Sequence, residues 1–144
     1  MKYKLDDDLM SAGFFEDTRI LGIVSTLKNY QFCWHIEKSM HIFFSTAVDL
    51  QIGMEKNTRS YSFTVYDYIH PISQVEHYLY TNKHEGEFLL PELQHLDFIW
   101  LMRDYAHDEL FFLSIQNQLR TINGVQLVSE VPLERIKSKN NLQR

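Results

Sequence analysis

The spacing of apolar residues changes several times along the chain, and each change indicates a different element. Residues 20–24 form an unbroken apolar run, which is typical of a strand buried on both faces. From about residue 27 to residue 41 apolar positions recur at steps of three and four, which predicts a helix. These positions form two adjacent faces, one of Cys33, Ile36 and Met40 and one of Leu27, Tyr30 and Trp34.

The middle of the chain switches to strict alternation. Tyr61, Phe63 and Val65 face one way, which predicts a half-buried antiparallel strand. Residues 75–82 alternate less strictly and are expected to pair with that strand. The intervening stretch of residues 43–52 fits neither period, so its structure stays open.

Three further elements are expected after residue 95. Residues 96–103 read as a strand, and Asp108 is a good N-cap for a second helix. The apolar positions of that helix are Phe111, Ile115, Leu119 and Ile122. Gly124 then suits the left-handed position after a helix, and residues 125–131 alternate as a last strand.

The resulting order is β-α-β-β-β-α-β in a single domain over residues 1–144. Two helices near the ends of an antiparallel meander can pack on the same face of its sheet. We therefore predict an α+β, two-layer sandwich: a ferredoxin-like variant with one added strand. Residues 1–17 are expected to be an irregular acidic N-terminal segment, and residues 133–144 a polar C-terminal tail.

Composition narrows the class of protein. A hydrophobic content of 44% in 144 residues is enough for a sizeable core. The net charge of −5 argues against a nucleic-acid partner, since such binding depends on neutralising phosphates. The single cysteine, Cys33, fits a reducing compartment. Three aspartates at 6–8 interrupt any signal peptide, and no apolar run could span a membrane, so we expect a cytoplasmic protein.

A Pro-Glu turn leads directly into the strand expected at residues 96–103. Pro91 fixes its own φ and favours extended geometry at Leu90. Asp97 then occupies a strand position, where aspartate is disfavoured. Alternation would place Asp97 on one face with Ile99 and Leu101, and Leu96, Phe98 and Trp100 on the other.

Two interpretations of Asp97 and Glu92 are open. As structural groups, either carboxylate would accept hydrogen bonds from the free amides of residues 92–95, because an unpaired buried carboxylate costs several kcal/mol. As chemical groups, they would form a ligand-binding pocket together with His95 and Tyr68. We favour the structural interpretation, since buried carboxylates are rare unless they are paired.

No pattern typical of catalysis or cofactor binding is visible. The seven histidines lack the spacing of a zinc site, and the five glycines form no phosphate-binding loop. Cys33 and His35 point in different directions on a helix, so a buried, inert thiol is expected. We therefore predict no catalytic residues, no metal ligands and no cofactor.

The chain resembles a bacterial family named for the signature Ile-Pro-Glu-x-x-x-Val-Asp-Tyr. Leu90-Pro91-Glu92 and Leu96-Asp97-Phe98 match it with three conservative replacements. The resemblance extends to the opening at residues 5–8, to Leu27-x-Asn29-Tyr30, and to the ending at residues 136–142. It implies no activity, substrate or cofactor, and Phe98 lacks the hydroxyl that the signature tyrosine carries.

Two functions follow from these observations. The first, which we prefer, is a non-enzymatic binding or interaction domain that acts as a homodimer through aromatic-rich surface. It rests on the two-sided first helix and on the aromatic residues of the middle strand, Tyr61, Phe63, Tyr66 and Tyr68. The second is a small-molecule or enzymatic pocket beside the Pro-Glu turn, near Glu92 and Asp97.

Overall fold

The computed structural model describes most of the chain after its N-terminal segment. The described residues are 15, 17–46, 50–54, 59–84, 86–103 and 109–142, with side chains left out at 50–54, 59–62 and 139. The predictions made for residues 1–14 and 16, for the Asp108 N-cap and for residues 143–144 of the tail lie outside them.

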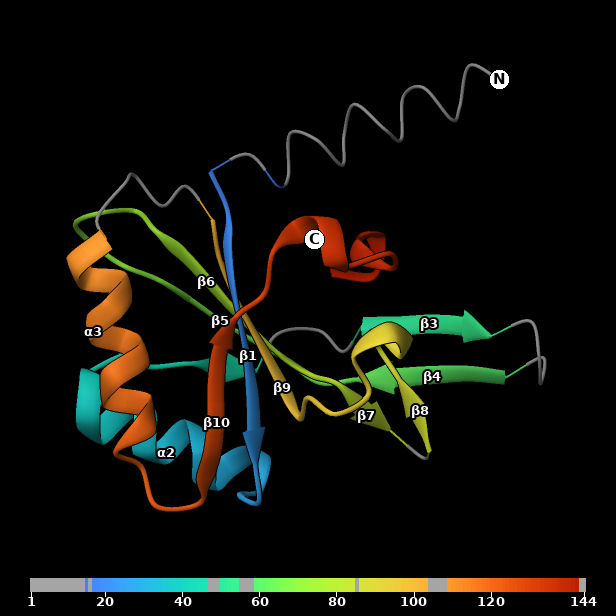
Figure 1. The fold of residues 1–144 in the computed structure, drawn as a ribbon, viewed down its shortest axis with the longest axis horizontal. Helices are drawn as coiled ribbons and strands as arrows, with labels where there is room; N and C mark the ends of the chain where they lie inside the picture. Colours follow the sequence, from blue (N-terminus) through green and yellow to red (C-terminus); the bar gives the residue numbers. More distant parts are fainter. Residues whose placement is uncertain are drawn as a thin grey trace.

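A six-stranded antiparallel sheet, in the order β10-β1-β9-β6-β5-β2, is the centre of the fold (Figure 1). Its strands are β1 (Arg19–Ser25), β2 (Ser45–Thr46), β5 (Val65–Ile69), β6 (Glu76–Thr81), β9 (Phe98–Arg103) and β10 (Val125–Glu130). The strands predicted at residues 20–24 and 96–103 are β1 and β9, which pair with each other inside the sheet.

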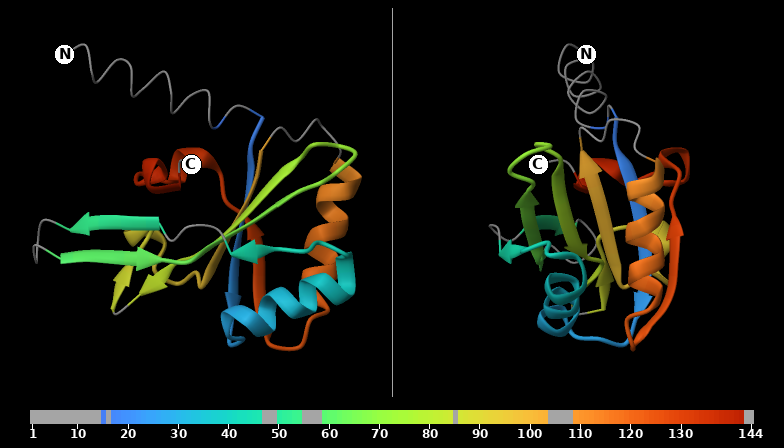
Figure 2. Two further views of the ribbon diagram at one scale, coloured as in Figure 1. Left: turned by 180° about the vertical axis from the view of Figure 1, so that it is seen from behind. Right: turned by 90° about the vertical axis from the view of Figure 1, so that its left-hand side faces the viewer.

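Two helices, α2 (Asn29–Met40) and α3 (Glu109–Arg120), cover one face of this sheet (Figure 2). Phe32 and Ile36 of α2, with Phe112 and Ile115 of α3, lie in one buried cluster with the sheet residue Trp100. The predicted α+β class, with an antiparallel sheet and both helices on one face, is confirmed.

The opposite face of the sheet has its own core, to which neither helix contributes a buried residue. Its members include Ile99 and Leu101 of β9, and Ile136 and Leu142 from the end of the chain. Gly22 of β1 lies under this cover: a Cβ there would come within 2.6 Å of the Leu96 side chain, so only glycine fits.

The C-terminal segment forms much of this cover, with two short 3₁₀ turns, η3 (Leu133–Arg135) and η4 (Lys139–Leu142). The sequence suggested a polar, solvated tail there. Arg135 and Lys137 are indeed exposed, but Ile136 and Leu142 are buried, because they fill the apolar face that the helices leave open.

Two small hairpins extend from the main sheet. The stretch left open at residues 43–52 contains β2 and the start of the first hairpin, and residues 47–49 lie outside the described part. One pairs β3 (Leu50–Met54) with β4 (Arg59–Phe63), and the other pairs β7 (Lys83–His84) with β8 (Glu87–Phe88). The strand predicted around residues 61–65 is therefore two strands, with a break at Thr64 between β4 and β5.

Three local predictions were wrong. Strand β9 begins at Phe98, so Asp97 precedes it, and Leu96 packs in the core with Ile99 rather than with Phe98. Phe112, not Phe111, carries the buried face of α3. Gly124 has the expected positive φ of 102°, but α3 has already ended at Arg120, so this glycine belongs to the following turn.

Candidate functional site

The Pro-Glu turn is organised around a buried asparagine at the end of β6. The Asn82 side chain donates to the carbonyls of Leu93 and Leu96, at 2.9 Å each. Its oxygen accepts the Leu90 N–H at 2.8 Å. Sequence reasoning did not single out Asn82; the only signal was a polar residue ending a strand. Three bonds from one side chain fix the turn η2 (Pro91–Leu93).

Asp97 is bound to groups that are distant in sequence. One carboxylate oxygen accepts the Ser25 N–H at 2.9 Å, and the other lies 2.8 Å from the Lys83 ammonium. The carboxylate thus joins the end of β1 to the β7–β8 hairpin. The sequence correctly indicated that this carboxylate accepts hydrogen bonds. It was wrong about the donors, which are not the amides of residues 92–95.

Glu92 ties the turn to the C-terminal segment. Its two carboxylate oxygens accept the N–H and the hydroxyl of Ser138, at 2.7 and 3.0 Å. Partial burial acts to raise the pKa of Glu92, but these bonds, with the backbone of Glu92 itself and of Lys137, outweigh burial and lower that pKa. Glu92 is therefore held as a carboxylate by the fold.

The four residues predicted for a ligand pocket do not share one environment. Tyr68 packs against the helix-side core, whereas Glu92 bonds to the segment on the opposite face. Tyr68 pairs with His77 near the start of β6, and Asp97 bonds to Asn82 beyond its end. His95 is exposed on the turn. The structure does not bring Tyr68 together with the other three.

Among the side chains that the structure describes, the most exposed aromatic surface lies instead on α2. Tyr30 is 66% exposed and Trp34 53%, and they stand one helical turn apart. Phe43, just after the helix, is equally exposed at 53%. The sequence assigned Tyr30 and Trp34 to a second apolar face of the helix. The structure leaves that part of the face uncovered, while Phe32 and Ile36 fill the core.

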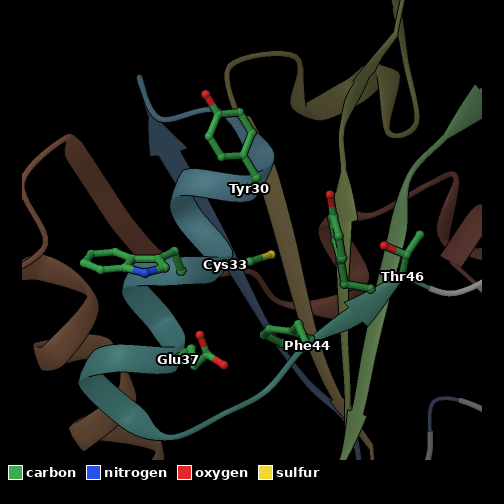
Figure 3. Close-up of a pocket in the computed structure, with 7 residues that line it drawn as sticks. Tyr30, Cys33, Glu37, Phe44 and Thr46 are labelled. Atoms are coloured by element: carbon green, nitrogen blue, oxygen red, sulfur yellow. The ribbon is translucent and has the colours of Figure 1, made fainter.

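Two shallow hollows flank the pair formed by Tyr30 and Trp34, and both side chains line each hollow. The first, of about 360 Å³, lies between α2 and the β2 edge of the sheet, and Figure 3 shows Cys33 and Glu37 on one side of it and Phe44 and Thr46 on the other. The second, of about 460 Å³, is also lined by Gln31 and His35. We call Tyr30 and Trp34 with these hollows the α2 surface.

The α2 surface carries a thiol and charged groups beside its aromatic rings. Burial raises the pKa of the Cys33 thiol to about 12, so it stays protonated and unreactive near neutral pH. Lys38 lies with its ammonium 5.8 Å from the centre of the Trp34 ring. Among the described residues, Glu37 makes no ion pair.

The aromatic residues of the middle strands do not form one exposed row. Phe63 is buried in the core on the C-terminal side, whereas Tyr66 and Tyr68 pack at the margin of the helix-side core. The Tyr61 side chain lies outside the described part. Of Phe63, Tyr66 and Tyr68, Tyr66 alone lines the first hollow of the α2 surface. Phe63 ends β4, which belongs to a different sheet from β5.

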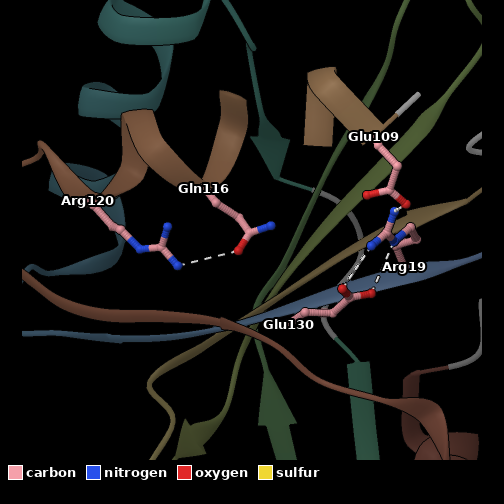
Figure 4. Close-up of polar contacts among 5 residues, drawn as sticks. All are labelled: Arg19, Glu109, Gln116, Arg120 and Glu130. Atoms are coloured by element: carbon pink, nitrogen blue, oxygen red, sulfur yellow. Dashed lines mark hydrogen bonds and ion pairs between the residues drawn. The ribbon is translucent and has the colours of Figure 1, made fainter. Parts of the chain in front are cut away.

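A second group of charged residues fixes α3 to the sheet (Figure 4). Arg19 binds the carboxylate of Glu130 with two nitrogens, at 3.0 and 2.8 Å, and also contacts Glu109. Its guanidinium carbon lies 3.9 Å from the centre of the Phe112 ring. At the other end of α3, Arg120 donates to the Val128 carbonyl at 3.0 Å. These interactions occupy the charged groups with contacts inside the fold.

Two general features are absent from the part of the chain that the structure describes. No helix there has the length and hydrophobicity needed to cross a membrane. Nor do three His, Cys, Asp or Glu side chains gather there as metal ligands would.

Comparison with known proteins adds nothing to this picture: no protein-family model and no curated protein matches the chain.

Proposed function

We propose that this protein is a non-enzymatic interaction domain that acts as a homodimer, with the α2 surface as its contact. The single observation that carries the proposal is the exposure of two neighbouring large aromatics, Tyr30 and Trp34, between two hollows on the same helix. Trp and Tyr are the residues most enriched at the energetic centres of protein interfaces.

Self-association suits this arrangement. In a twofold dimer the same patch is used by both subunits, so it must contain both projections and the depressions that receive them. The α2 surface has both. A specific interface buries about 800 Å² on each partner, more than two side chains supply, so Phe43 and the surrounding polar residues would complete it.

The alternative of a pocket beside the Pro-Glu turn has no such support. Both oxygens of Asp97 and both oxygens of Glu92 are occupied by donors within the fold. A carboxylate that is to bind a ligand or move a proton would have to break those bonds first. We therefore assign Asp97 and Glu92 to holding the turn rather than to chemistry.

The resemblance to the Ile-Pro-Glu signature family agrees with this assignment. Leu90 and Leu96 are buried in the core beneath the turn, and Glu92 and Asp97 anchor that turn to other segments. If the chain is a divergent member of that family, its signature preserves a fold element, and the interaction surface lies elsewhere.

The proposal is tested by multi-angle light scattering at micromolar concentrations. The unmodified protein is expected to be a dimer, and Trp34→Glu a monomer, because a charge on the exposed face would be buried unpaired in the interface. Leu113→Glu is the matched control: it places the same charge at an exposed apolar position on α3, and should leave the dimer intact. Circular dichroism would verify that both variants fold.

A strictly monomeric unmodified protein would contradict the proposal. So would a Trp34→Glu variant that dimerises as well as the Leu113→Glu control, since the contact would then lie elsewhere.

A further inference from the structure

We infer that the first hollow of the α2 surface binds a small organic cation that carries an N-methylated ammonium group. The inference goes beyond the homodimer and does not depend on it, because every group that would hold the ligand belongs to one subunit. A ligand in the first hollow also leaves the second hollow open to a partner.

The hollow lies between α2 and the β2 edge of the main sheet (Figure 3). Strand β2 pairs there with β5, and Thr46 stands directly opposite Tyr66. Directly opposed residues of an antiparallel pair point to the same face of the sheet. Tyr66 packs against the helix-side core, so both residues face the helix layer. At about 360 Å³ the hollow has the volume of a small ligand site.

The lining of the hollow is mainly aromatic. Four of its seven residues are aromatic: Tyr30, Trp34, Phe44 and Tyr66. The face of an aromatic ring carries negative partial charge, so it attracts a cation that lies over it. The α2 surface already shows this contact, because the Lys38 ammonium lies 5.8 Å from the centre of the Trp34 ring.

Glu37 gives the hollow its charge. Of the seven lining residues it alone is charged near neutral pH, since burial keeps the Cys33 thiol protonated. Glu37 is half-buried, and its carboxylate has no partner among the described residues. A bound cation would compensate this charge. An anion would meet both the carboxylate and the ring faces, so the hollow selects for positive charge.

The same lining favours an N-methylated ammonium over a primary one. A primary ammonium has three N–H donors, and each one needs an acceptor once it leaves water. A quaternary ammonium has no donors to satisfy. Its methyl groups can contact the aromatic rings while its charge stays close to Glu37.

Titration followed by amide NMR spectra of the full chain tests the inference. Choline chloride is the probe, and 3,3-dimethylbutan-1-ol is its neutral analogue, with carbon in place of the nitrogen. Sodium chloride keeps the ionic strength equal. Choline should shift the signals of Glu37, Phe44 and Thr46, with a dissociation constant at least about fivefold lower than that of the alcohol. Equal constants, or shifts confined to other parts of the chain, would overturn the inference.

Ethanolamine, which carries a primary ammonium, tests the class of cation. Its dissociation constant should be at least about threefold higher than that of choline, because its donors are only partly satisfied in the hollow. If ethanolamine binds as tightly as choline, the assignment to N-methylated ligands is wrong.

A charge variant tests the role of Glu37. Glu37→Gln should weaken choline binding by about threefold to tenfold, the effect of losing one partly exposed ion pair, and should leave binding of the alcohol unchanged. Glu134→Gln is the matched control, because Glu134 is exposed on the C-terminal segment. If the two variants bind choline equally, Glu37 does not hold the cation and the inference fails.

Two neighbouring phenylalanines test the aromatic lining. Phe44 lines the hollow, whereas Phe43, the residue before it, does not. Phe44→Leu should weaken choline binding more than Phe43→Leu does, and equal binding by the two variants would contradict the inference. None of these titrations depends on the light-scattering result, so the ligand site and the homodimer can each fail alone.

Discussion

At the scale of single residues, the polar groups of this protein act mainly by joining segments that are far apart in sequence. Asp97 bonds to Ser25 and Lys83, and Glu92 to Ser138. Each carboxylate is partly buried, and each is held by at least one backbone N–H. Such hydrogen bonds to charged groups contribute about 1.5–3 kcal/mol each, so these two residues should matter to stability.

Replacement of Asp97 by Asn should therefore destabilise the protein. We expect a loss of about 1–2 kcal/mol in the free energy of unfolding, because the amide keeps one acceptor but loses the charge. Urea denaturation measures it. Lys83→Ala should cost less, about 0–1 kcal/mol, since this ion pair is largely exposed. An Asp97→Asn variant as stable as the unmodified protein would refute a scaffold role.

His77 is the one buried histidine among the described residues, and it is neutral at pH 7. Its Nδ1 accepts the Trp100 indole N–H at 3.1 Å. Burial, and next the nearby His70, lowers the pKa of His77 from 6.5 to about 4. The folded protein thus binds this proton only at a lower pH than the unfolded chain does. The stability that His77 contributes is present above pH 6.5 and is lost as the pH falls towards 4.

His77→Asn tests this, because an amide oxygen can still accept the Trp100 N–H but does not titrate. Between pH 6.5 and 4.5 the unmodified protein should lose up to about 1.4 kcal/mol of stability per pH unit more than the variant. Urea denaturation at several pH values gives both curves. Parallel curves across this range would mean that the folded protein binds the His77 proton as readily as the unfolded chain does, so that the pKa of His77 is not lowered.

At the scale of elements, the C-terminal segment covers one face of the sheet with apolar side chains, as the two helices cover the other face. Ile136 and Leu142 are buried in the second core, and the Tyr80 hydroxyl donates to the Leu142 carbonyl. Asn141 donates to the Leu89 carbonyl at 2.8 Å. A segment that reads as polar in sequence is thus part of the hydrophobic structure.

Replacing Leu142 by alanine should show how much this segment contributes to the stability of the fold. Leu142→Ala is expected to lower the free energy of unfolding by about 2–5 kcal/mol, the range for a fully buried leucine. Leu110→Ala, at an 80% exposed position of α3, should change it by no more than about 0.5 kcal/mol. If the two variants unfold alike in urea, the C-terminal segment does not pack on the sheet in solution.

At the scale of the whole molecule, one sheet with two cores leaves an aromatic surface of the described residues, Tyr30 and Trp34, uncovered. Strand β9 serves both cores, with Trp100 and Met102 on the helix side and Ile99 and Leu101 on the other. Helix α2 uses Phe32 and Ile36 inside, and has Tyr30 and Trp34 left outside. That surplus is why the homodimer, rather than a pocket beside the Pro-Glu turn, is the function proposed for this chain.

The sequence by itself determined the fold class and the positions of the main elements. The apolar runs of β1 and β9 and the helical spacing of α2 and α3 are local patterns, and burial of those residues is sufficient to specify a layered α+β structure. It also indicated that α2 carries more apolar surface than one sheet can cover, because two of its adjacent faces are apolar.

Only the tertiary structure decided what each polar residue contacts and which apolar face stays open. Asp97 finds its amide donor in Ser25, 72 positions earlier, and Asn82 finds three partners in a turn that follows it. No spacing rule predicts such pairs, because they depend on which strands lie side by side. In the same way, Leu142 is buried because it packs on the sheet face that the two helices do not cover. Trp34 is exposed because it lies on the side of α2 that points away from the sheet core. Both outcomes depend on the assembled molecule.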